Sequence, residues 1–280
     1  MPVYEQSYRS HEARGPLRQI RFWPILREGL RLLLARRALL ILGMLAWLPL
    51  VARVIQVYVV TRFPEAGQLL PVDGRLFGEF LNQQLGFVLL LVIFSGAGLI
   101  AEDLRSGAII VYLSRPLTRR DYVLGKLGIL LGVGLAVTLV PGLLLYFAAV
   151  GLAPGSFLEV RLVWIAPAVA LHSLAMCLVY GLLMLALSSL SRSARVAGLG
   201  FAALVLGLEL VVAIVQANFD LPAARLLSLQ QDVRMLGEAL FGIAERPGLL
   251  GWPGACAVLA ATAAVSLVVI RHRVRAVEVV

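Results

Sequence analysis

Residues 101–126 read AEDLRSGAIIVYLSRPLTRRDYVLGK, and this charged, proline-containing stretch separates two long apolar runs. It holds five basic and three acidic residues. The runs on either side, near residues 80–101 and 123–150, are each long enough to cross a bilayer, which takes about 20 residues of α-helix. A charged segment between two such runs is expected to be a loop at one membrane surface.

The rest of the chain is strongly apolar: 60% of its 280 residues are hydrophobic, 15% are charged, and the mean hydropathy is +0.92. Four more apolar runs lie near residues 38–60, 162–190, 196–216 and 249–270. We therefore expect an all-α membrane protein with a six-helix domain over residues 38–271, a cytoplasmic N-terminus over 1–37 and a tail over 272–280. The third and fourth runs are long enough to bend, and Pro141 and Pro167 are the expected positions.

Basic residues are distributed unevenly among the ends of the runs. The formal charge is +9, but the basic residues flank apolar segments and form no basic soluble face, so nucleic acid is not an expected partner. Of the 25 Lys and Arg residues, 18 fall on the side that holds both termini and the 101–126 loop, and six fall on the other. The positive-inside rule then places both termini and this loop in the cytoplasm.

Ahead of the first run, residues 16–37 carry apolar side chains at helical spacing with arginines largely between them. This pattern predicts an amphipathic helix in the membrane interface, with Trp23 at headgroup depth and the arginines toward water and lipid phosphates. The alternative is a plain extension of the first transmembrane helix, with Arg36 and Arg37 marking its start.

A long outer segment, residues 217–248, precedes the last run and exceeds the length of an ordinary structureless loop. Apolar residues recur in it at helical spacing, at Leu226, Leu229, Val233, Leu236 and Leu240. We expect a short external helix there that lies on the outer leaflet or dips into it, either as a lid or for packing alone.

Two ionisable residues lie within the expected spans. Arg53 and Glu209 each stand about seven residues from the outer end of their run, roughly 10 Å deep at 1.5 Å per residue. Their opposite signs and matching depth predict an ion pair, either within one chain or across a dimer. Alternatively Arg53 extends outward alone and Glu209 faces a wet cavity.

Catalytic or ligand-binding chemistry is scarce. The segment RDYVLGKLG lacks the first glycine and the hydroxyl of a phosphate-binding loop, so ATP is not bound by that motif. His172 and Ser173 are neighbours that point about 100° apart on a helix, and Ser95 would meet His172 only through tertiary contact. Cys177 and Cys256 offer neither a disulfide framework nor a metal-ligand spacing. No catalytic, cofactor or metal residues are therefore expected.

Besides the positive charges that set the membrane orientation, residues 101–126 contain signals for a turn and for the start of a helix. A turn follows Ser114, and Thr118 and Asp121 stand where the next helix begins, which predicts a short cytoplasmic helix and then a capped entry into the membrane. Here the chain resembles the permease subunits of ABC-2 type transporters. That family commonly shows an acidic residue, a glycine, a Leu-Ser-x-Pro-x-Ser/Thr-Arg run and a Gly-Lys entering the third span. The matching residues are Glu102 or Asp103, Gly107, Leu113, Ser114, Pro116, Thr118, Arg119, Gly125 and Lys126.

The resemblance extends over nearly the whole chain and implies an ABC permease that works with a second permease copy and two ATPase subunits. ATP would bind to the ATPases, so this chain itself holds no cofactor. The loop over about residues 102–122 would be the coupling helix. Its implied contacts are charges at Glu102, Asp103 and Arg105, apolar side chains at Ile109, Ile110, Tyr112 and Leu113, a turn at Pro116, and Lys126 at the inner headgroups.

The resemblance also implies a bacterial or archaeal plasma membrane, with membrane lipids around the chain. The importer signature with Glu-Ala-Ala and a distant glycine is not evident in the cytoplasmic loops, which favours export. A secondary transporter would instead show inverted repeats and several midplane charges, and an intramembrane enzyme would show polar residues converging at one depth. The substrate is not indicated by any motif.

Overall fold

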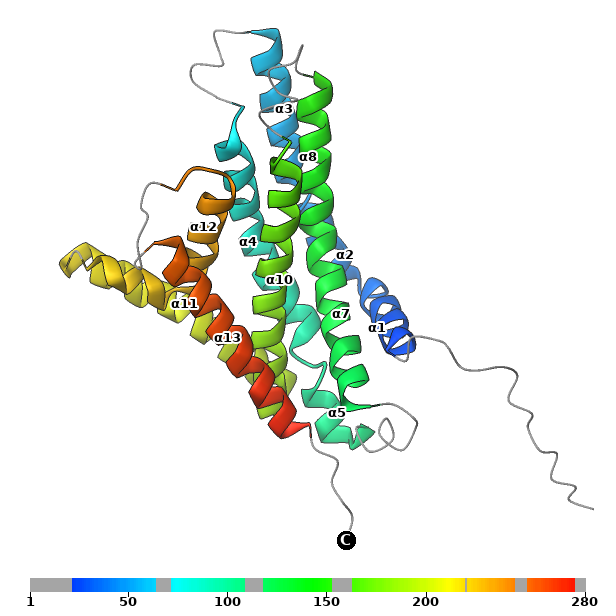
Figure 1. Cartoon of the computed structure of the whole chain (residues 1–280). Helices are drawn as coiled ribbons and strands as arrows, with labels where there is room; N and C mark the ends of the chain where they lie inside the picture. Colours follow the sequence, from blue (N-terminus) through cyan, green and yellow to red (C-terminus); the bar gives the residue numbers. More distant parts are fainter. Residues whose placement is uncertain are drawn as a thin grey trace, which may run out of the picture.

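The computed structural model describes residues 22–63, 72–108, 118–152, 163–219, 221–244 and 251–274. Across these ranges the protein is built from helices, with no strand (Figure 1). Six helical stretches of the described residues are long and apolar enough to cross a membrane. The expected all-α fold with six spans is confirmed.

Three of the spans are single helices and three are made of two pieces. The single helices are α10 (Ile165–Leu190), α11 (Ala194–Phe219) and α13 (Trp252–Arg273). The two-piece spans are α2 (Arg37–Leu45) with α3 (Leu48–Arg62), α4 (Gly74–Gly96) with α5 (Ala101–Ser106), and α7 (Arg119–Val137) with α8 (Leu139–Leu152). Outside the spans lie α1 (Trp23–Leu34), the 3₁₀ helix η2 (Pro222–Leu227) and α12 (Leu229–Leu240).

Helix α10 forms the centre of the bundle. It is the most buried of the six spans and packs against α4, α7, α8, α11, α12 and α13. One end of the bundle carries α5 and the last turn of α13, and the other carries α12, the end of α3 and the start of α4 (Figure 1). These are called the α5 end and the α12 end below. Both ends are therefore built directly onto the same central helix.

The third span is interrupted where the backbone cannot continue its hydrogen-bond ladder. Pro141 has no N–H to donate to the preceding turn, and the helix breaks at Thr138, whose hydroxyl donates to the Gly134 carbonyl at 2.9 Å. The helix is thus interrupted within one turn of Pro141, while a bend at this position stays a prediction. The predicted bend at Pro167 is wrong, because Pro167 lies in the first turn of α10, where a backbone N–H has no helical partner to lose.

Helix α1 is separate from the first span. It ends at Leu34, and Arg36 has an extended backbone (φ −84°, ψ 109°) that breaks the path into α2. One face of α1 packs against the bundle, while Trp23, Arg27 and Arg31 are exposed. The structure confirms the amphipathic helix and contradicts a plain extension of the first span.

Glycines let α1 lie directly on α7, whose lower half it follows in Figure 1. Gly125, Gly128 and Gly132 recur on one face of α7, and α1 side chains occupy the space that their missing Cβ atoms leave. A Cβ on Gly125 would stand 2.9 Å from the Cβ of Ile25, closer than such atoms approach. Small residues at this contact therefore set the distance between the two helices.

Helix α12 lies inside the bundle at its end, packed against α4, α10, α11 and α13. The Ser228 side chain caps its first turn by accepting from the Gln231 N–H at 3.3 Å. Leu229 and Val233 are buried, as the apolar stripe predicted. The expected short helix in residues 217–248 is confirmed, and it penetrates the bundle.

A substitution of Gly125 by Leu should separate α1 from α7. The new side chain must displace the β-branched Ile25, which costs about 1–3 kcal/mol for an overpacked contact. We expect a lower thermal unfolding midpoint for the purified protein. Gly86→Leu is the matched control, since a Cβ at Gly86 meets nothing within 4 Å. Equal midpoints for both variants would contradict close packing of α1 on α7.

Candidate functional site

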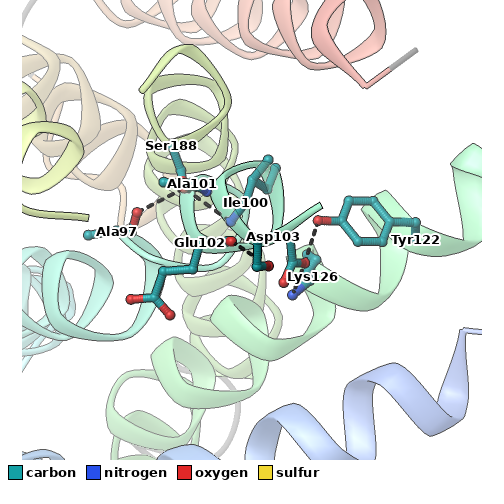
Figure 2. A network of polar contacts seen from close by, with 9 residues as sticks. Ala97, Ile100, Ala101, Glu102, Asp103, Tyr122, Lys126 and Ser188 are labelled. Carbon is teal, nitrogen blue, oxygen red and sulfur yellow. Dashed lines mark hydrogen bonds and ion pairs between the residues drawn. The ribbon is translucent and has the colours of Figure 1, made fainter. Parts of the chain in front are cut away.

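The turn between α4 and α5 is held by one buried hydroxyl of the central helix. Ser188 Oγ of α10 donates to the Ala97 carbonyl at 2.9 Å and accepts from the N–H groups of Ile100 at 3.1 Å and Ala101 at 3.0 Å (Figure 2). Ser188 is fully buried, so water does not compete for these bonds. The start of α5 is thereby fixed to α10.

An ion pair joins α5 to α7. Asp103 Oδ2 lies 2.7 Å from Lys126 Nζ and also accepts from the Tyr122 hydroxyl at 2.7 Å (Figure 2). The Lys126 side chain is 9% exposed and that of Asp103 17%, so each charge depends on the other for compensation. With Ser188, this cluster ties α5 to two spans.

This pairing corrects two expectations for the site. Lys126 does not extend to the inner headgroups, because its ammonium group turns back to Asp103. Asp103 faces the chain's own lysine and is not among the exposed charges of α5. Tyr122 was missed from the sequence, although it stands four residues before Lys126 and therefore on the same face of α7.

The helix ends at this site have the geometry that their residues predict. Gly107 closes α5 with φ +71°, in the left-handed region where a side chain is strained. Thr118 caps α7 in a reciprocal box, in which the Thr118 N–H donates to Asp121 Oδ2 at 3.0 Å and the Asp121 N–H donates to Thr118 Oγ1 at 3.2 Å. The predicted capped entry into the third span is confirmed.

The outward surface of the site consists of charged side chains. Glu102 and Arg105 on α5 and Arg119 at the start of α7 are exposed. In Figure 2 the Glu102 carboxylate points away from the Asp103 cluster. The remaining predicted site residues lie outside the described part of the chain: Ile109, Ile110, Tyr112, Leu113, Ser114 and Pro116.

A family model described as "ABC-2 family transporter protein" matches residues 32–270 of this chain. The chain belongs to the ABC-2 transporter family. As an ABC-2 permease it is a multi-pass membrane protein and a transport subunit, not an enzyme. The matched region contains α5, the Ser188 bonds and the Asp103–Lys126 pair. Comparison with curated proteins found no match.

The two charges predicted to pair inside the permease have other partners in the chain. Arg53 of α3 forms an ion pair with Glu79 of α4, at 3.1 Å between Nη2 and Oε2, and donates to Gln56 Oε1 at 2.9 Å. Glu209 of α11 accepts a hydrogen bond from the Ser228 hydroxyl. The pair within one chain is therefore wrong, because α3 packs on α4 and α8 while α11 packs on α10 and the outer segment. A pair across a dimer stays a prediction.

The α12 end holds a second group of polar residues that the sequence analysis did not single out. Asp232 is fully buried, and neither of its carboxylate oxygens has a hydrogen-bond partner among the described residues. Asp232 lies three residues after Leu229 and four before Leu236. Residues at this spacing share one face of a helix, so the sequence pattern alone indicates that Asp232 is on the apolar, inner face of α12. Burial raises the pKa of the Asp232 carboxyl to about 7.

Replacement of Lys126 by Met should destabilise the permease, because it leaves the Asp103 carboxylate without its counter-charge. We expect a loss of about 3 kcal/mol, the low end for a broken buried pair, since Asp103 keeps the Tyr122 hydroxyl. Adding Asp103→Asn to Lys126→Met should restore most of the lost stability, measured as the thermal unfolding midpoint. Arg119→Met, which removes an exposed positive charge, is the control, and a loss as large as that of Lys126→Met would show that net charge alone is responsible.

The raised pKa of Asp232 predicts a pH-dependent stability. A carboxyl whose pKa is higher in the docked helix than in the unfolded chain stabilises the fold in its neutral form. That contribution is complete below about pH 4, the usual range of an aspartate, and is lost as the pH rises through about 7. In a buffer without small metal cations, the thermal midpoint should fall from pH 5 to pH 7 and stay level at higher pH. Asp232→Asn should flatten this slope, and parallel slopes would exclude Asp232 as its source.

Proposed function

We propose that this permease is the membrane subunit of an ATP-driven exporter and that a separate ATPase subunit binds and hydrolyses the ATP. Two permeases and two ATPases would form the complete transporter. The observation that carries the proposal is the attachment of α5 to α10 through Ser188 and to α7 through Asp103 and Lys126. A partner that displaces α5 must move two core helices with it.

The exposed charges of α5 are the proposed contact for the ATPase. Glu102 and Arg105 are free to meet opposite charges on a soluble partner, while Asp103 is occupied inside the chain. Gly107 lets the chain turn sharply after α5. Tyr112, Leu113, Ser114 and Pro116, in the segment that follows, would extend the contact with apolar and turn residues. A force-transmitting element needs this combination, because a partner acts only through contacts that differ between its two states.

The α5 end would face the cytoplasm, where ATP and a soluble ATPase are available. The basic residues that end α13, Arg271 and Arg273, lie at this same end (Figure 1). Their position agrees with the positive-inside rule and would place both termini in the cytoplasm. A bacterial or archaeal plasma membrane is the location that fits a separate permease and ATPase.

Export is the proposed direction, since the cytoplasmic loops lack the importer signature. The apolar surface of the spans would place the chain among lipids, from which a lipid-like substrate could be extracted. Membrane lipids and a second permease copy are therefore the expected partners within the bilayer.

The proposal is tested by exchanging the exposed charges of α5. Glu102→Lys combined with Arg105→Glu should abolish binding of the ATPase that copurifies with the wild-type permease, while the thermal midpoint stays unchanged. Arg75→Glu, at the α12 end, is the control and should leave the complex intact. Retention of the ATPase and of ATP-driven transport by the double variant would overturn the proposed docking site. Copurification of no ATPase with the wild-type chain would overturn the subunit assignment.

A further inference from the structure

The buried face of α12 combines apolar side chains with one carboxylate. Leu229, Val233 and Gly237 pack inward, and Asp232 lies among them with 0% of its surface exposed. Both carboxylate oxygens of Asp232 lack a hydrogen-bond partner within the described ranges. A buried carboxylate without partners is unfavourable enough that its presence needs a physical explanation.

Two further polar groups from other helices converge on Asp232. The Tyr180 hydroxyl of α10 is fully buried, has no hydrogen-bond partner in the described part of the chain, and interacts electrostatically with both Asp232 and Glu209. Glu209 of α11 is oriented by the Ser228 hydroxyl at the start of α12. The phenol and the Asp232 carboxylate are therefore within electrostatic range of each other but share no hydrogen bond.

Among the described residues, the surroundings of these two groups supply negative charge and little that would balance it. Two other ionisable side chains lie close to α12: His172 of α10, whose ring lies against Gly237, and Cys256 of α13, which interacts electrostatically with Asp232. The arginines nearest in the sequence, Arg225 and Arg234, are exposed. Above about pH 7, where Asp232 is ionised, water beside the carboxylate would satisfy its hydrogen bonds but would leave its charge uncompensated. A bound positive charge would satisfy both.

We propose that Asp232, Tyr180 and Glu209 form a binding site for one small monovalent cation beneath α12. The ligand is an alkali ion or a primary ammonium group, which carboxylate and phenol oxygens can coordinate or accept hydrogen bonds from. A divalent metal is not the proposed ligand, since the described residues contain no cluster of three or more His, Cys, Asp or Glu side chains able to hold one.

Occupancy of this site would join three helices at the α12 end. Asp232 belongs to α12, Tyr180 to the central α10 and Glu209 to α11, so one bound cation would contact all three. Helix α11 is far less buried than α10 and leaves the bundle along its length, so a contact at this end would add to its attachment (Figure 1). The site is independent of any ATPase, and its test uses the permease alone.

The test measures cation-dependent stability of the purified full-length chain at pH 8. Thermal midpoints are recorded while sodium, potassium or methylammonium chloride replaces N-methyl-D-glucamine chloride at constant total chloride. We expect a saturable rise with at least one of the three small cations, and the three arms distinguish an alkali ion from an ammonium group. Asp232→Asn and Tyr180→Phe should each weaken cation binding and so raise the half-saturating concentration by about tenfold or more.

Glu238→Gln is the matched control, because Glu238 lies on the exposed face of the same helix. This variant should keep the wild-type titration. Should Asp232→Asn fail to fold, Tyr180→Phe provides the comparison, since it removes only one oxygen. A wild-type midpoint that is the same in all four salts would overturn the proposal and leave the neutral form of Asp232 as the explanation for its burial. An equal loss of the titration in Glu238→Gln and Asp232→Asn would also overturn it, because ion binding would then be a surface effect.

Discussion

The attachment of α5 to the central helix is the contact on which the α5 end of this permease depends. A helix of six residues has too few internal hydrogen bonds to be stable alone. Its first turn is instead bonded to Ser188 of α10, and its Asp103 is neutralised by Lys126 of α7. Because Ser188 is fully buried and the ion pair is mostly so, these bonds are not exchanged for bonds to water. The short helix is thereby held as a rigid part of two spans.

The α12 end also packs on the central helix, but apolar burial holds it there in place of hydrogen bonds and an ion pair. Apolar burial of Leu229 and Val233 docks α12, and glycine at position 237 allows the close approach of His172. The described residues satisfy the polar groups at this end only in part, in contrast to the paired cluster around Asp103. A paired cluster rigidifies a junction, whereas an unsatisfied one leaves room for a ligand or for movement. The two ends of α10 thus differ: one is a rigid junction of paired groups, and the other leaves polar groups available to a ligand.

Much of the fold could be read from local patterns along the chain. Runs of about 20 apolar residues predict the spans, because every backbone polar group in a bilayer must be satisfied within its own helix. The capping box of Thr118 and Asp121 and the left-handed Gly107 are equally local, since each involves residues at most a few positions apart. The motif around residues 101–126 also led to the right family. The bend assigned to Pro167 failed because the effect of proline depends on where the helix begins.

Composition, periodicity and short motifs by themselves determined the class of protein, the number of spans, the amphipathic α1 and the helix in the outer segment. Only the tertiary structure decided which charges meet. Asp103 and Lys126 are 23 positions apart, and Arg53 and Glu79 are 26 apart, so their partners follow from which spans pack together. Depth and sign made Arg53 and Glu209 a reasonable pair, but α3 packs mainly on α8 while α11 packs mainly on α10, and each charge finds another partner. The burial of Asp232 likewise emerges only when α12 is seen inside the bundle, because burial is a property of the packed helices and not of the helix alone.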